Sequence, residues 1–163
     1  MNISLMRQIS FCAGHRLLGH EGKCANLHGH NYVAEIYVSG SEFDSLGRVV
    51  DFAVINRLFK GWIDENWDHG MIIFNEDTEA LNALSAVTPN RVFPLPYNPT
   101  AENMARYLLT EVGPKLLDSI KGYDLRLTKV VIWETDKSSA TAELGSPNQV
   151  DSAWSENRSA SQG

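Results

Sequence analysis

The sequence lacks the features that mark several classes of protein. It has only two cysteines, Cys12 and Cys24, and nothing in it indicates secretion, so we expect reduced thiols in a cytoplasmic protein rather than a disulfide. No apolar run approaches the roughly 20 residues that span a bilayer, and the start of the chain does not resemble a signal peptide. There is no lysine or arginine run and the formal net charge is −6, so we expect no binding to nucleic acid or membrane.

The rest of the composition is that of one folded domain with a short tail. The chain has 163 residues, and 43% of them are hydrophobic, which is enough for one core. We expect residues 1–145 to form this domain. Residues 146–163 are rich in serine and other polar residues and poor in apolar ones, which is typical of a flexible tail. No segment of the sequence repeats.

The spacing of apolar residues predicts an α+β fold with helices on one face of an antiparallel sheet. Helical spacing covers residues 51–67 and 99–117, and Thr100 is a suitable N-cap for the second helix. Residues 76–99 are rich in proline towards their end and are expected to form a loop. We expect strands at residues 2–17, 30–40, 48–52, 71–75, 124–135 and 138–144, with the second and third paired as a hairpin.

Two of these strands alternate clearly enough for their faces to be assigned. Strict alternation between residues 124 and 135 places Leu127 on one face and Val130 on the other. In the strand at residues 30–40, the predicted apolar face consists of Tyr32, Ala34, Ile36 and Val38.

Two of the five histidines, His28 and His30, stand two positions apart at the head of a predicted strand. Side chains alternate along a strand, so both rings are expected on one face, and the intervening Gly29 permits a close approach to the backbone. His15 ends the preceding strand and supplies a third imidazole. Three imidazoles with an open fourth position are typical of a catalytic zinc site, whereas the alternative is a pair of histidines exposed at a turn.

The two cysteines have different contexts. Cys24 lies shortly before His28, and three interpretations are open: a fourth zinc ligand, a base or nucleophile whose thiolate a nearby cation favours, or a buried unreactive thiol. Cys12 lies inside an apolar strand, where we expect a buried and unreactive thiol.

Two acidic positions are further candidates. Asp68 precedes His69 directly after the first predicted helix, and a carboxylate stabilises a protonated imidazole, so the pair is a candidate proton donor; the alternative is a polar loop. Glu134 ends an apolar strand. If it is buried, the paired N–H groups of a ligand would satisfy it, and the alternative is a carboxylate in water.

Together these residues resemble the 6-pyruvoyltetrahydropterin synthase and 6-carboxytetrahydropterin synthase family over about residues 4–144. The resemblance implies the tunnelling fold, in which two helices cover a four-stranded antiparallel sheet, three subunits close a twelve-stranded barrel, and two trimers stack into a homohexamer. It rests on the order of the motifs AGHRL around His15, C-x-x-x-H-G-H from Cys24 to His30, VVDF at 49–52, DHG at 68–70, NPTAEN at 98–103 and ET at 134–135.

The resemblance also implies a role for each candidate residue in the metal centre. Zinc would bind to His15, His28 and His30 and would polarise the side-chain hydroxyls of the substrate, 7,8-dihydroneopterin triphosphate. Cys24 would be the base that removes a proton from the neighbouring carbon. A base is favoured over a fourth ligand because the three histidines leave the open position that the substrate needs.

The same resemblance places the remaining candidates around the pterin. Asp68 and His69 would form the opposing proton relay, facing Cys24 of a neighbouring chain across one cavity. Glu134 would anchor the pterin ring, and Thr100 would line the same pocket.

The three-residue gap between Cys24 and His28 resembles the carboxy-forming branch of the family, which releases triphosphate and acetaldehyde and feeds queuosine and other deazapurines. The pyruvoyl-forming branch typically has a longer gap, and a folate-related branch has glutamate near the cysteine position. We therefore expect the carboxy-forming activity. The alternatives are the pyruvoyl-forming activity, a zinc hydrolase, and a non-catalytic zinc protein with a closed Cys-His₃ site. Candidates for binding the triphosphate are Arg7, Arg16 and Lys23.

Overall fold

The computed structural model describes residues 3–145, so the tail expected at residues 146–163 lies outside the described residues. The strands are β1 (Ile3–His15), β2 (His28–Gly40), β3 (Gly70–Phe74), β4 (Val92–Leu95), β5 (Leu125–Thr135) and β6 (Ser138–Glu143). The α-helices are α1 (Phe52–Asn66), α2 (Thr78–Ser85), α3 (Ala101–Tyr107) and α4 (Gly113–Asp118). A 3₁₀ turn occupies Lys23–Ala25, and a π-helical turn, Leu108–Val112, joins α3 to α4.

The strands form one mixed sheet in the order β4-β3-β1-β2-β5-β6. The pairs β1–β2, β2–β5 and β5–β6 are antiparallel, as the family resemblance implied for its four strands. However, β3 and β4 extend the sheet beyond β1 as parallel strands, so the expectation of a four-stranded, purely antiparallel sheet is wrong. Helix α2 lies between β3 and β4 in the chain and provides the crossover that parallel neighbours require.

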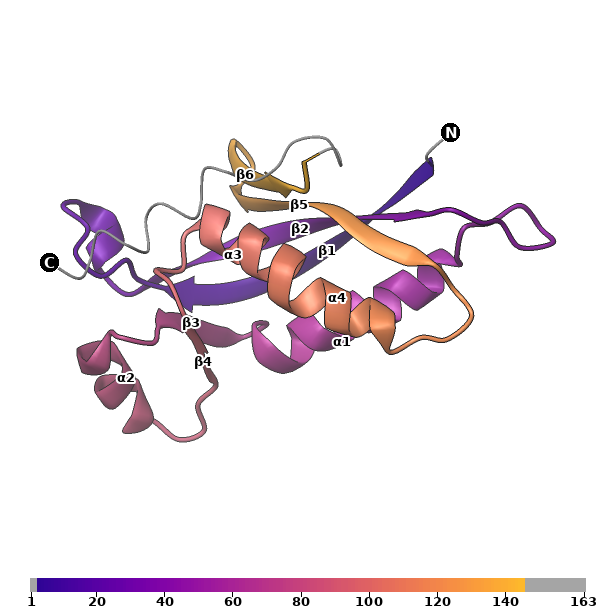
Figure 1. Cartoon of the computed structure of the whole chain (residues 1–163). Helices are drawn as coiled ribbons and strands as arrows, with labels where there is room; N and C mark the ends of the chain where they lie inside the picture. The colour runs from indigo at the N-terminus through magenta and orange to yellow at the C-terminus, as the bar shows by residue number, and fades with distance from the viewer. Residues whose placement is uncertain (1–2, 146–163) are drawn as a thin grey trace, which may run out of the picture.

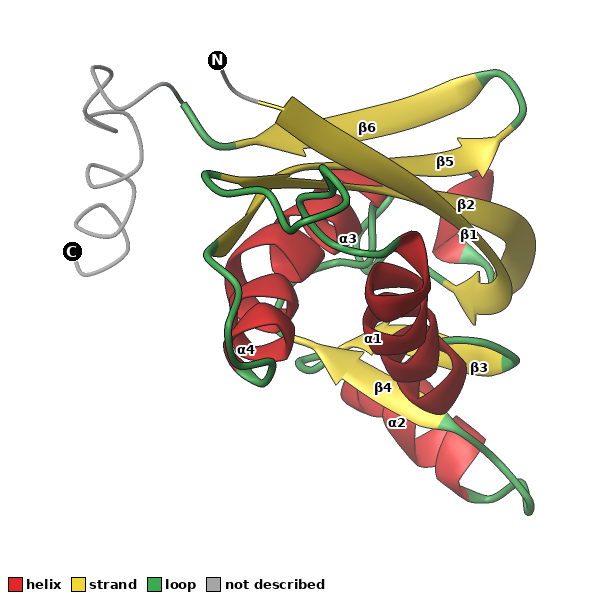
Figure 2. Ribbon diagram, turned by 90° about the vertical axis from the view of Figure 1, so that its right-hand side faces the viewer, coloured by secondary structure: helices red, strands yellow, loops and turns green. Residues whose placement is uncertain are grey.

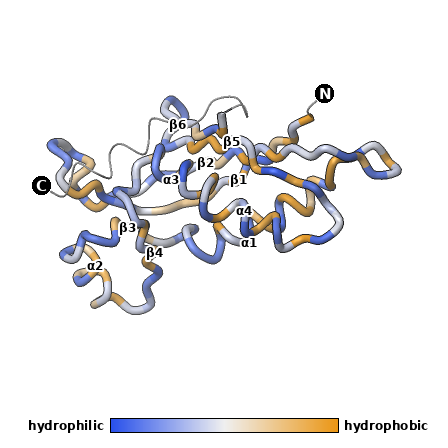
Figure 3. Tube along the Cα trace, viewed as in Figure 1, coloured by the Kyte–Doolittle hydropathy of each residue, from blue (hydrophilic) through white to orange (hydrophobic). Residues whose placement is uncertain are grey.

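Helices α1, α3 and α4 lie along one side of the long strands (Figure 1), as the sequence predicts. The sheet curls, so that β3 and β4 turn away from the layer formed by β1, β2, β5 and β6 (Figure 2). Hydrophobic and hydrophilic residues are interleaved along α1 and α4 (Figure 3), which gives each helix an apolar side for the core. The predicted inner face of β2 is confirmed by four residues that are at most 1% exposed: Tyr32, Ala34, Ile36 and Val38.

Two predictions for connecting segments are wrong. Residues 48–51 form no strand; β2 pairs with β1 and β5 instead, and Val49 and Val50 are buried without joining the sheet. The expected loop at residues 76–99 contains α2 and β4. Asp77 caps α2 by accepting a hydrogen bond from the Ala80 N–H, and Pro94 is tolerated in β4 because that strand lies at the edge of the sheet.

The helices begin where their capping residues lie. Asp51 accepts a hydrogen bond from the Ala53 N–H at the start of α1, and the expected N-cap Thr100 accepts one from the Asn103 N–H at the start of α3. Beyond α3 the helix widens into the π turn just before Pro114, whose ring cannot donate to the preceding turn.

Strand β5 contains an irregularity that changes which side chains face the core. Tyr37 pairs with Lys129, whereas Val38 pairs with Leu127, so Thr128 is an extra residue in β5. Leu127 and Val130 are consequently both buried, which corrects the strict alternation expected here.

None of the helices within residues 3–145 is long and apolar enough to cross a membrane. Both cysteines are free, and Cys12 is exposed rather than buried as expected. It follows Phe11, which is buried, and side chains alternate along β1, so Cys12 lies on the opposite face of the strand.

Candidate active site

His15, His28 and His30 meet at one end of the β1–β2 pair. His15 lies directly opposite His28 in the antiparallel register, and His30 lies opposite Ala13, so all three rings fall on one face as predicted. The potential ligand atoms of the three rings lie within 4.8 Å of one another. The ring centroids are 4.5 Å apart for His15 and His28 and 5.0 Å apart for His28 and His30.

Backbone carbonyls orient two of these rings. The Nδ1 of His15 lies 2.7 Å from the Pro99 carbonyl oxygen, and the Nδ1 of His28 lies 2.7 Å from the Asn26 carbonyl oxygen. A carbonyl can only accept, so each Nδ1 carries the proton and each Nε2 presents a lone pair. The two Nε2 atoms lie 3.1 Å apart. This orientation of imidazoles by a second hydrogen bond is typical of metal-binding histidines.

Burial keeps His15 uncharged. His15 is only 1% exposed, and this burial lowers the pKa of its ring below the usual value. The Tyr32 hydroxyl lies 3.3 Å from both ring nitrogens of His15, and burial raises the pKa of that phenol, so it stays protonated. A neutral imidazole is the form that binds a metal ion.

The ring nitrogen of His30 is the strongest indication of a cation-binding site at the three histidines. This Nε2 is buried and has no hydrogen-bond partner among the described residues. A buried nitrogen without a partner is costly, and a metal ion would satisfy it. The three histidines therefore fit a zinc ion with an open fourth position.

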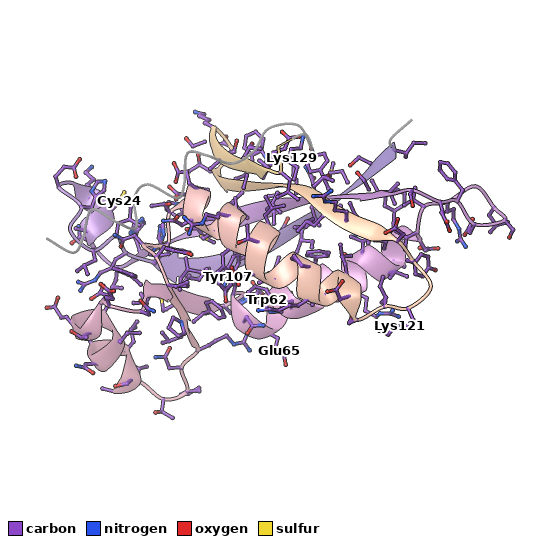
Figure 4. All side chains as sticks on the ribbon, in the orientation of Figure 1. Cys24, Trp62, Glu65, Tyr107, Lys121 and Lys129 are labelled. Carbon is purple, nitrogen blue, oxygen red and sulfur yellow. The ribbon has the colours of Figure 1, made fainter. Side chains whose placement is uncertain are left out.

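Cys24, Thr100 and Glu134 lie beside His15. They line a cavity of about 270 Å³ together with His15. Cys24 lies in the 3₁₀ turn at one end of the molecule, remote from the aromatic core around Trp62 and Tyr107 (Figure 4).

Cys24 and Glu134 stand next to the histidine group but outside it. Cys24 is not among the ligand atoms that gather within 4.8 Å, whereas the closed Cys-His₃ site would require it there. Glu134 Oε1 lies 3.7 Å from His30 Nε2, and the side chain is 28% exposed. This carboxylate is therefore half-buried beside the histidines and not surrounded by water.

Asp68 and His69 are in contact, as their sequence positions suggested. Asp68 Oδ2 lies 2.9 Å from His69 Nδ1, and Asp68 Oδ1 accepts a hydrogen bond of 2.9 Å from the Cys12 N–H. Burial opposes ionisation, but these two hydrogen bonds outweigh it and hold the pKa of Asp68 below its usual value. His69 lines a second cavity of about 630 Å³, which His28 and His30 also line and which Cys24 and Glu134 do not.

Residues of the NPTAEN segment hold the backbone that contacts His15, a role that was not predicted from the sequence. The Asn98 side chain accepts from the Leu18 N–H and donates to the Leu18 carbonyl, and the Asn103 side chain donates to the Asn98 carbonyl. These bonds hold the Pro99 carbonyl against His15. Two asparagines close to a proline and an N-cap are typical of a segment whose backbone is fixed by side-chain hydrogen bonds, and this pattern could have indicated the role.

Arg16 has a structural partner instead of a free guanidinium. It donates two hydrogen bonds of 2.6 Å to Asp77, whose side chain is only 1% exposed, and one of 2.9 Å to Glu79. Arg16 therefore ties the residue after His15 to the start of α2, and this candidate for binding the triphosphate already contacts two carboxylates. The buried Asp77 was not recognised, because residues 76–99 were expected to form a loop.

Fold and site together define the class: an α+β protein whose sheet carries a candidate three-histidine metal centre beside a thiol and a carboxylate. A family profile described as 6-pyruvoyl tetrahydropterin synthase matches residues 4–144. The chain is 45% identical over 133 residues to a 6-carboxy-5,6,7,8-tetrahydropterin synthase of Rickettsia bellii, a match that covers 82% of this chain and 94% of the relative.

Solved structures agree with this result. An uncharacterized protein of Wolinella succinogenes superposes with a TM-score of 0.71 at 24% identity, covering 89% of this chain and 99% of that one. The 6-pyruvoyl tetrahydropterin synthase of Caenorhabditis elegans gives 0.60 at 27% identity, covering 89% and 97%. The chain belongs to the 6-pyruvoyl tetrahydropterin synthase family and is an enzyme of the tetrahydropterin synthase type, a lyase.

Proposed function

We propose that the chain is a zinc-dependent 6-carboxy-5,6,7,8-tetrahydropterin synthase. It converts 7,8-dihydroneopterin triphosphate with release of triphosphate and acetaldehyde, and it serves the synthesis of queuosine and related deazapurines. The observation that carries the proposal is the single cavity that brings His15 together with Cys24, Thr100 and Glu134. The name of the Rickettsia bellii relative and the three-residue gap before His28 support the carboxy-forming reaction.

The metal would be held by the Nε2 atoms of His15 and His28 and by the His30 ring. When bound, zinc supplies a Lewis acid that polarises the substrate's side-chain hydroxyls and makes the neighbouring C–H more acidic. The carbonyls of Pro99 and Asn26 keep the first two rings in place, so the metal group needs no rearrangement to bind substrate.

Cys24 acts as the base that removes this proton. The thiol lines the cavity without belonging to the compact ligand group, which leaves its sulfur available to the substrate. A cation close by favours the thiolate, which is the form that accepts a proton. The position of Cys24 outside the ligand group speaks against the closed, non-catalytic Cys-His₃ site.

Glu134 anchors the pterin ring. Its carboxylate can accept two hydrogen bonds, one from an amino group and one from a ring N–H, and this paired geometry matches the edge of a pterin. Thr100 forms the wall of the same cavity at the start of α3, where its hydroxyl is held by the Asn103 N–H.

Asp68 and His69 donate the proton on the other side of the substrate, from a neighbouring chain. Two observations support a shared site: His69 lines a different cavity from Cys24, and much of the sheet edge is unpaired. β1 pairs with β3 only at Ala13–His15, and within residues 3–145 no strand pairs with the outer edge of β6. Closing a barrel from several chains would cover both edges, consistent with a homohexamer of two stacked trimers.

The proposal is tested by incubating the zinc-loaded protein with 7,8-dihydroneopterin triphosphate and identifying the products by mass. A 6-carboxy product with equimolar acetaldehyde is expected. A 6-pyruvoyl product with triphosphate and no acetaldehyde would assign the other branch, and simple loss of phosphate would assign a hydrolase.

The free thiols of Cys12 and Cys24 support a reducing, cytoplasmic location for this reaction.

A further inference from the structure

A second group of potential metal ligands lies on the opposite face of β1 from His15. It consists of Cys12, Asp68 and His69, whose Sγ, carboxylate oxygen and ring nitrogen lie within 4.8 Å of one another. Cys12 alternates with the buried residues Phe11 and Ala13, so its thiol faces away from the three-histidine group. The two groups therefore do not share a ligand.

The backbone holds this second group together. The Cys12 N–H donates to Asp68 Oδ1, and the Cys12 carbonyl accepts a hydrogen bond of 2.7 Å from the His69 N–H. The backbone of one cysteine thus fixes both the carboxylate and the histidine beside its own thiol. His69 adopts a φ of 55°, in the left-handed region that a non-glycine residue occupies only when its surroundings enforce it.

The donor set suits a divalent cation that prefers sulfur and nitrogen. A thiolate and a carboxylate together balance a charge of about +2, while neutral imidazole adds a third ligand without charge. Ligands of tetrahedral zinc lie about 3.3–3.8 Å apart, so the three side chains need to approach one another only slightly. The Asn31 Oδ1 lies 3.1 Å from the Cys12 sulfur and offers an oxygen as a fourth ligand.

Space for the ion and its water is available. Cys12, Asn31 and His69 line the cavity of about 630 Å³, which His28 and His30 also line, and the His69 side chain is 79% exposed. A cation can therefore enter from solvent without opening the fold.

We propose that Cys12, Asp68 and His69 form a second cation site, which binds a sulfur-preferring divalent ion such as Zn²⁺ or Cd²⁺ independently of the three-histidine group. Binding releases the thiol proton of Cys12 to solvent and places the sulfur lone pair on the metal. The ion also binds Asp68 and His69, so excess metal inhibits turnover. This last consequence alone rests on the proposed proton relay.

The experiment is a titration of the metal-free full-length protein with Co²⁺, whose bond to a thiolate gives a charge-transfer absorption band. Wild type should bind two Co²⁺ per chain, and the band should appear as the second equivalent is added. Cys12→Ser should bind one Co²⁺ per chain without the band, because replacing a thiolate by a hydroxyl weakens this site at least about tenfold. Cys24→Ser is the matched control and should keep both ions and the band.

A second variant guards against a folding defect. His69→Asn retains a residue that tolerates the left-handed conformation, and it should also lose the second Co²⁺. Binding of only one Co²⁺ by wild type, or a band that survives in Cys12→Ser and disappears in Cys24→Ser, would overturn the proposal. The latter result would instead place the thiolate in a closed site with the histidines.

The inhibitory consequence is measured separately. The rate of each protein at one zinc per chain is its own reference, and inhibition of Cys12→Ser by further zinc should require at least about tenfold more metal than inhibition of wild type. If the Co²⁺ titration succeeds while no synthase activity is found, the cation site stands and the proposed function fails. Equal inhibition of both proteins would show that the second ion does not act through this site.

Discussion

The Nε2 atoms of His15 and His28 face one another at 3.1 Å, although each ring donates its only proton to a backbone carbonyl from Nδ1. Two lone pairs at this distance repel each other unless a cation lies between them. Two nitrogens bound to tetrahedral zinc lie about 3.3 Å apart, which is close to the separation observed. The carbonyls of Pro99 and Asn26 therefore orient two rings of the candidate metal centre, whose histidines can be tested individually.

We expect His28→Ala to lose the tightly held zinc and the activity together. The variant removes one of three ligands and leaves an open two-histidine site that binds zinc weakly. Metal analysis after zinc-supplemented preparation and dialysis measures the loss. His20→Ala is the control, because His20 only accepts a local hydrogen bond from the Gly22 N–H. Wild-type occupancy below about half would contradict the three-histidine site.

Glu134→Gln should weaken substrate binding more than folding or zinc binding. The amide presents a donor to one of the two pterin N–H groups, and losing one charge-assisted hydrogen bond costs about 1.5–3 kcal/mol, or roughly tenfold to a hundredfold in affinity. Steady-state kinetics on 7,8-dihydroneopterin triphosphate should show this as a higher KM. Zinc content should be unchanged, because Glu134 lies outside the compact ligand group. Wild-type KM and turnover would place Glu134 outside the pterin pocket.

Asp77→Ala should destabilise the fold by about 2–4 kcal/mol, because it removes a buried partner of Arg16 and the N-cap of α2 at once. Denaturant unfolding at neutral pH measures the loss. Glu79→Ala is the matched control: the same Arg16 binds Glu79, but that side chain is 85% exposed, so the change should be below about 1 kcal/mol. Equal effects would show that burial does not determine the strength of this pair.

The contribution of Asp77 should also depend on pH. The hydrogen bonds from Arg16 hold the pKa of Asp77 below its usual value, despite burial. The folded state therefore binds the proton less readily than the unfolded state, and this stability is present above about pH 4 and is lost as the pH falls through the lowered pKa. Wild type and Asp77→Ala should converge in stability at acidic pH. A constant difference down to the acid transition would contradict this assignment.

The clustering of the three histidines could be predicted from the sequence because its geometry is local. His28 and His30 share a face through strand alternation alone, and His15 joins them because β1 and β2 are antiparallel neighbours. Alternation along β1 predicts that Cys12 lies on the opposite face from the buried Phe11 and is exposed. The expectation of a buried thiol rested only on the apolar neighbours of Cys12.

Features that depend on tertiary pairing could not be predicted in this way. The extra residue Thr128 reflects the register between β2 and β5, which no periodicity within β5 reveals. Helix α2 was overlooked because the prolines after it outweighed its own short pattern, although Asp77 followed by Glu79 is a typical helix start. The Asp77 side chain at its start is held by Arg16, which is remote in sequence.

The last prediction concerns which chains form one active site. Cys24 and His69 line different cavities of the same chain, so within one chain they do not line a common cavity. If the site is shared, Cys24→Ala and His69→Asn should each be nearly inactive, since every site in either protein lacks one of the two groups. Asparagine is chosen because the φ of 55° at His69 would strain most other replacements.

Refolding the two inactive variants together at equal amounts should restore activity. With random assembly, a site receives an intact Cys24 from one chain and an intact His69 from its neighbour about a quarter of the time, so about a quarter of wild-type turnover is expected. Native mass spectrometry must first show that mixed oligomers have formed, and refolding each variant alone provides the background rate. Recovery near the expected fraction would mean that the two residues act from different chains. Mixed oligomers that stay inactive would mean that Cys24 and His69 act within one chain, after a movement that brings the two cavities together.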